Sequence, residues 1–141
     1  MADVTLATKK LQVFFEMKEI ESSASVVDTM LLDDRTIHMT KRHFFSLAPD
    51  ATTAIDVTSP PSKEGFPKWF FLNSTNVRLR YAFESTSVGT ANPKLGTDLR
   101  EGGFALFCSD NASNNTIYIH NRNTVTTAVV TLVVQQTTWT L

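Results

Sequence analysis

The stretch VRLRYAFE, residues 77–84, decides the fold of this chain. Its apolar residues recur at every second position, at Val77, Leu79, Tyr81 and Phe83, and mostly polar residues fill the positions between them. Alternation of this kind predicts a strand that buries one face and exposes the other, as in an antiparallel sheet.

The same period of two continues in both directions from this stretch. It predicts strands at residues 10–18, 26–32, 35–47 with a bend, 54–58, 68–73, 77–84, 103–109, 116–121 and 125–134. The segment Val26–Leu32 also permits a helix, with Ile20, Ala24, Val27 and Leu31 on one face, although we favour a strand there. Because no helix separates the other strands, we predict an all-β fold: an antiparallel β-sandwich of about eight strands, with a jelly roll as the leading topology.

The bulk properties indicate one soluble domain over residues 1–141. Its net charge is −1, and we expect no nucleic-acid partner because phosphate binding requires a basic excess. The longest apolar stretch, Ala128–Val134, is too short to span a membrane. The first residues show no export signal, so we expect synthesis and retention in the cytoplasm.

A search for chemistry finds no enzyme motif, and we expect no catalytic residue, cofactor or metal. The three histidines, His38, His43 and His120, lack the spacing of a metal site. The best enzymatic alternative is the pair Glu84 and Glu101, although solvated strand ends explain both. Cys108 shares a strand face with Phe104 and Leu106, which predicts a buried thiol.

The aromatic residues are more informative. Phe14 lies on the polar face of its strand, and the strand at 68–73 is apolar on both faces, with Trp69 and Phe71 on one of them. The strand at 125–134 is also apolar on both faces and leads to Trp139. Strands of this kind need a cover on both sides. A segment of the same chain, such as residues 49–67, or another subunit could provide it.

Two further features concern the surface. Arg78 and Arg80 share a strand face, and we expect both to face outward and to attract acidic partners. The asparagine-rich segments 73–76 and 121–124 predict hairpin turns. Two long irregular segments, 49–67 and 85–102, are candidates for functional loops.

The second half of the chain resembles the small β-sandwich proteins of tailed-phage virions. The resemblance rests on the strand at 68–73 and its turn, the alternating strand at 77–84, the segment 99–107, the strand at 117–121 and the final strand. It is closest to capsid decoration (cement) proteins with a jelly-roll fold, and less close to small tail or baseplate proteins. It implies a structural role in many copies, with a major capsid protein and other copies of the chain as partners.

We therefore expect a non-enzymatic virion protein, made in the host cytoplasm and working as an oligomer. A carbohydrate-binding or adhesion module is the main alternative, because Trp69 and Trp139 could stack on sugars. The candidate interface residues are Phe14, Trp69, Phe71, Arg78, Arg80 and Trp139.

Overall fold

The structure is a computed structural model that describes residues 10–21, 24–63, 65–85, 88, 96–109 and 114–137, with the backbone alone for residues 10–36. In this part of the chain no helix is long and apolar enough to cross a membrane. The strands are β1 Lys10–Glu21, β2 Ala24–Leu47, β3 Thr52–Asp56, β4 Lys68–Ser74, β5 Leu79–Ala82, β6 Thr97–Leu99, β7 Phe104–Ser109, β8 Thr116–Asn121 and β9 Ala128–Thr137.

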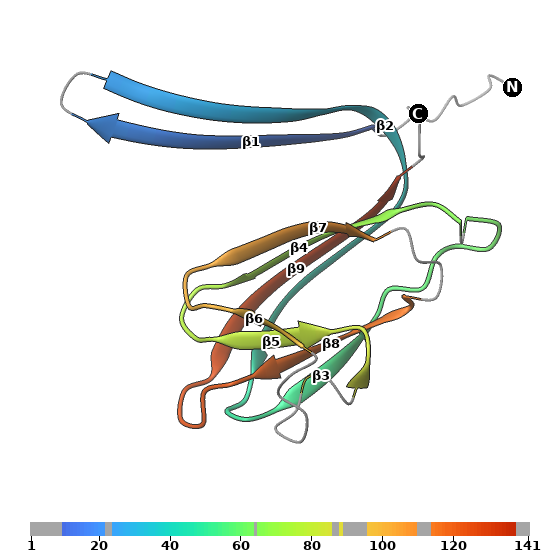
Figure 1. The fold of residues 1–141 in the computed structure, drawn as a ribbon. Helices are drawn as coiled ribbons and strands as arrows, with labels where there is room; N and C mark the ends of the chain where they lie inside the picture. Colours follow the sequence, from blue (N-terminus) through green and yellow to red (C-terminus); the bar gives the residue numbers. More distant parts are fainter. Residues whose placement is uncertain are drawn as a thin grey trace, which may run out of the picture.

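These strands form two antiparallel sheets (Figure 1). The large sheet has the order β1-β2-β9-β4-β7, and the small sheet has the order β3-β8-β5-β6. The pairs β2–β9, β3–β8, β4–β7 and β5–β6 are nested, so that β2 pairs with the last strand and β3 with the last but one. Nested pairs divided between two packed sheets define a jelly roll. The predicted all-β sandwich with jelly-roll topology is confirmed.

One strand, β1, lies outside this wound pattern. It pairs with residues 24–36 of β2, whereas residues 37–47 of β2 pair with β9. Two bulges give β2 an extra residue, at Asp33–Asp34 opposite β1 and at His38 opposite β9. A bulge bends its strand and increases its twist. The hairpin of β1 and residues 24–36, which we call the arm, therefore bends out of the large sheet, doubles back and is drawn apart from the sandwich (Figure 1).

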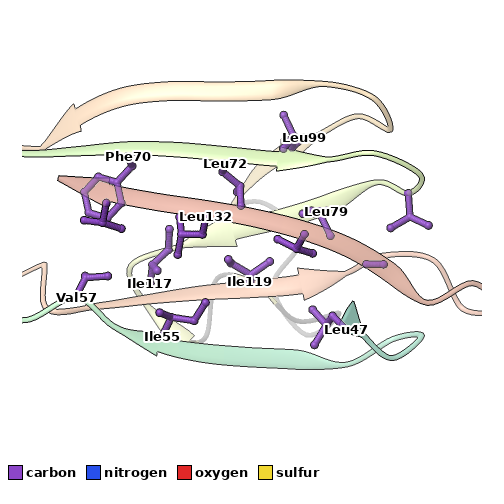
Figure 2. Close-up of a cluster of buried hydrophobic side chains, with 14 residues drawn as sticks. Leu47, Ile55, Val57, Phe70, Leu72, Leu79, Leu99, Ile117, Ile119 and Leu132 are labelled. Carbon is purple, nitrogen blue, oxygen red and sulfur yellow. The ribbon is translucent and has the colours of Figure 1, made fainter. Parts of the chain in front are cut away.

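The hydrophobic core lies between the two sheets, where side chains from both point toward one another (Figure 2). Each inward position follows the alternation of its strand, as in β4, where Phe70 and Leu72 are fully buried. Strand β9 contributes Leu132, and β8 contributes Ile117 and Ile119 from the opposite sheet. Burying each large apolar side chain stabilises the fold by about 1.5–3 kcal/mol. This core holds the outer faces of both sheets in fixed positions.

The segment after β3 closes one end of the sandwich. Val57 is part of the core, and the buried Gln136 on the inner face of β9 holds the segment through its side-chain amide. The Nε2 atom donates to Ser59 Oγ at 3.0 Å and to the carbonyl oxygens of Lys63 and Phe66 at 2.6 and 3.1 Å. These contacts place the described part of the segment 49–67 over the end of the core.

The two predicted hairpin turns are wrong. Segment 73–76 connects β4 to β5 and segment 121–124 leads from β8 to β9, and in both cases the two strands belong to different sheets. The asparagines brace these crossings instead. Asn121 Nδ2 donates to the carbonyl oxygens of Leu47, Ala48 and Thr126, and Asn76 bridges to the start of β9.

Most strand limits differ from the prediction by one to three residues, the predicted strands 26–32 and 35–47 form the single strand β2, and two other places differ more. The alternating stretch 77–84 contributes only four residues, Leu79–Ala82, to β5. Strand β6, Thr97–Leu99, lies inside the predicted loop 85–102, because three residues are too few to show a period of two. The ambiguous segment Val26–Leu32 is a strand, as favoured, and forms part of β2.

Candidate functional site

The candidate site is the outer face of the large sheet, on the side away from the core. Strand register and burial alternation place fourteen residues of four strands there. We call this surface the outer face. Its members are Thr40, Arg42, Phe44 and Ser46 of β2; Val129, Thr131, Val133 and Gln135 of β9; Trp69, Phe71 and Asn73 of β4; and Phe104, Leu106 and Cys108 of β7.

Much of the apolar surface here is open to solvent. Phe44 is 72% exposed, Phe104 51% and Val129 50%, and these are three of the four large hydrophobic residues exposed in the described chain. Sequence analysis did not select them. The consecutive pair Phe44-Phe45 could have revealed the first of them, because neighbouring residues in a strand point to opposite faces.

The predicted residues Trp69 and Phe71 do lie together on the outer face, half-buried in its middle. The Nε1 atom of Trp69 donates to Thr137 Oγ1 at 3.2 Å, which fixes the ring against β9. The ring of Phe71 stacks on that of Phe104, with 6.1 Å between centroids. These contacts within the sheet hold both aromatic rings in place while leaving their outer surfaces available.

The prediction of a buried thiol at Cys108 is wrong. It shares a face with Phe104 and Leu106 as expected, but that face is the outer one and the thiol is exposed. The core side of β7 is occupied by Phe107, whose ring stacks on Phe70 with 5.0 Å between centroids and on Tyr81 with 5.5 Å. When both faces of a strand have large apolar residues, alternation alone does not show which face packs in the core.

Two other candidate interface residues lie apart from this surface or beyond what is described. Phe14 is in β1 of the arm, in register with Leu31, and its side chain is outside the described part of the structure. Trp139 lies outside the described residues. The sugar-binding alternative, which depends on Trp69 together with Trp139, therefore has one of its two aromatic residues described.

The arginine pair belongs to the small sheet, on the other side of the molecule. Arg78 is exposed, but Arg80 is only 4% exposed, so the expectation that both face solvent is wrong for Arg80. The acidic partner is Asp98 on the neighbouring strand β6, which accepts from Arg80 Nε at 3.0 Å and from Arg122 Nη1 at 2.8 Å. Hydrogen bonds from Arg80 and then Arg122 lower the pKa of the Asp98 carboxyl, against the effect of partial burial.

The acidic pair considered for catalysis is exposed at both positions. Glu101 lines a surface pocket with Arg78 and Arg122, and Glu84 is not among the residues that line it. Within the described residues, no group of three or more His, Cys, Asp or Glu side chains is arranged to hold a metal ion.

Among the described residues, the most deeply buried ionisable side chain lies at the closed end of the sandwich. Lys68 is 1% exposed, and its Nζ donates to the carbonyl oxygen of Asn114 at 2.9 Å and to Asn115 Oδ1 at 3.4 Å. Burial lowers the pKa of Lys68, the charge of Lys41 lowers it further, and Asp56 opposes both. The hydrogen bonds tie β4 to the start of β8, so Lys68 serves to close the sandwich.

Comparison with known proteins adds little to this description. No family model and no curated protein matches the sequence. Among solved structures, the fold is similar to the "Schizosaccharomyces pombe Cnp3 Cupin Domain", with a TM-score of 0.38 and 8% sequence identity. The alignment covers 88% of this chain and 87% of that chain. This similarity transfers no function.

Proposed function

We propose that this chain is a non-enzymatic structural protein of a virion, a capsid decoration (cement) protein that binds and stabilises a shell of a major capsid protein. The observation that carries the proposal is the outer face, on which Phe44, Phe104 and Val129 are half or more exposed. Large apolar side chains exposed on one sheet face favour its assignment as a place that another macromolecule covers.

The composition of the outer face is typical of a surface that is buried against another protein. Aromatic and aliphatic side chains alternate with hydroxyls and amides, and Arg42 supplies its one cation among the described residues. Interfaces are enriched in aromatic residues and arginine, whereas acid–base catalysis needs titratable groups that converge on a pocket. The partners proposed for this surface are other copies of the chain and the major capsid protein.

The rigid sandwich suits repeated contacts on a shell. A flat sheet face buries its side chains without reordering the backbone, so little conformational entropy is lost on binding. Many weak contacts on one particle then add through multivalency. A tail or baseplate protein could use the same surface, and it would differ in copy number.

The test is to purify particles from the source organism and to measure this chain against the shell protein by quantitative mass spectrometry. We expect a simple stoichiometric ratio to the shell protein. A few copies per particle would indicate a tail or baseplate component. Absence from washed particles, together with a monomeric pure protein in light scattering at every concentration, would rule out the proposed role.

A further inference from the structure

The arm is a two-stranded ribbon with two unequal faces. Register places Val13, Phe15 and Met17 of β1 on the same face as Val26, Met30 and Leu32 of β2, together with Ala24, Glu19, Glu21 and Asp28. We call this the apolar face of the arm. The other face has Phe14, Ile20, Val27 and Leu31 interspersed with Glu16, Lys18, Ser25 and Thr29.

Such a ribbon needs a surface to pack on. An isolated two-stranded hairpin is marginally stable at best in water, and it becomes stable when it packs a hydrophobic face against another element. In the described chain β1 is hydrogen-bonded to β2 alone, and the arm doubles back after the bend in β2 and is drawn apart from both sheets of its own sandwich (Figure 1). Among the described strands of the sandwich, none other than β2 pairs with β1, so the apolar face of the arm is a candidate for contact with another copy.

The charges of the two parts are complementary. Residues 10–36 have a net charge of −3, and residues 37–137 have a net charge of +2. The carboxylates of the arm are Glu16, Glu19, Glu21, Asp28, Asp33 and Asp34, and its cations are Lys10, Lys18 and Arg35. Three of these carboxylates, Glu19, Glu21 and Asp28, share the apolar face, and Arg42 lies exposed on the outer face. Opposite charges beside an apolar contact favour this pairing over one between like faces.

We propose that the arm of one copy packs its apolar face on the outer face of a second copy. This inference rests on the proposed function, and it names the arm of another copy as a partner of the outer face. β1 has 12 residues and so spans about 40 Å, whereas the 7 residues of β4 span about 24 Å. The arm is therefore long enough to cross the whole outer face. Two apolar sheet faces pack at about 10 Å and bury the side chains of both.

Cys108 allows a direct test in the full chain. It is the single cysteine of the sequence and is exposed on the outer face, so a cysteine introduced into the arm has one possible partner thiol besides its own copies. Leu32→Cys places a thiol on the apolar face of the arm, and Leu31→Cys places one on the opposite face. The two variants replace neighbouring residues of the same type and so form a matched pair.

We expect Leu32→Cys to form an intermolecular disulfide under mild oxidation, visible as a reducible dimer or ladder on a gel, about tenfold or more faster than Leu31→Cys. Adding Cys108→Ser should abolish that product. Met30→Cys is a second position on the apolar face, for use if Leu32→Cys does not fold. Equal rates for the matched pair, or a disulfide within one chain, would overturn the inference.

The outcomes also separate this inference from the proposed function. If arm cysteines fail to cross-link while outer-face variants still weaken association, the arm assignment is wrong and the assembly role stands. If the wild-type protein neither self-associates nor occurs in particles, both are wrong.

Discussion

Replacing Phe44 with threonine tests whether the outer face holds copies of the chain together. Phe44 is 72% exposed, and a buried aromatic side chain covers about 150–250 Å², so its contact would remove about 110–180 Å² from water. At about 25 cal/mol per Å² this area contributes about 3–4 kcal/mol. Because 1.4 kcal/mol is about a factor of ten, Phe44→Thr should weaken association about 100- to 1000-fold.

The matched control is Val125→Thr. Val125 is 84% exposed in the connection between β8 and β9, so it is an apolar residue outside the outer face. Threonine keeps the strand propensity of the Phe44 position, and neither exposed side chain supports the core. Both variants should stay within about 0.5 kcal/mol of the wild type in urea unfolding. Sedimentation equilibrium gives the association constants. If Phe44→Thr had the same association constant and the same stability as the wild type, the reasoning would be refuted.

Three further predictions concern stability and are measured by urea unfolding. Asp98→Asn leaves Arg80 buried without a carboxylate and should cost about 1–3 kcal/mol at pH 7, less than a fully buried pair because the Asp98 side chain is 42% exposed. Since the pKa of Asp98 is lowered on folding, this difference should be complete above about pH 3.9 and vanish as the pH falls through the lower folded-state pKa. Since burial lowers the pKa of Lys68, the wild type should gain stability relative to Lys68→Met as the pH rises toward about 10.4, and parallel curves would contradict this. Asn121→Ala removes three donated bonds from a buried side chain and should cost about 2–4 kcal/mol, against about 1 kcal/mol for the exposed Asn76→Ala.

The fold class could be predicted because it depends on a local property, the alternation of apolar residues along each strand. The stretch 77–84 and the segment 116–121 show it, and both contain strands. Sheet membership could not be predicted in the same way. Asparagine-rich segments of four residues suit a hairpin turn as well as a crossing between sheets, and only the pairing of strands distant in sequence distinguishes the two.

The candidate site was predicted in part. Trp69 and Phe71 were placed correctly on one face of β4 because successive residues of a strand point to opposite faces. Phe104 and Cys108 were assigned to the core because parity shows which residues share a face but not which face is buried. Arg80 was expected in solvent, and the pairing of β5 with β6 instead brings Asp98 beside it. Each of these errors concerns a contact between strands distant in sequence.

The two sheets of the sandwich differ in how their outer surfaces are satisfied, and this difference is the strongest reason to assign association to the large one. On the outside of the small sheet, Arg80 binds Asp98, and the two ring nitrogens of His120 lie 2.8 Å from Thr52 Oγ1 and 3.2 Å from an Asp50 carboxylate oxygen. Those polar groups are paired within the chain and remain compatible with water. On the large sheet, Phe44, Phe104 and Val129 are half or more exposed, and covering them would remove apolar surface from water.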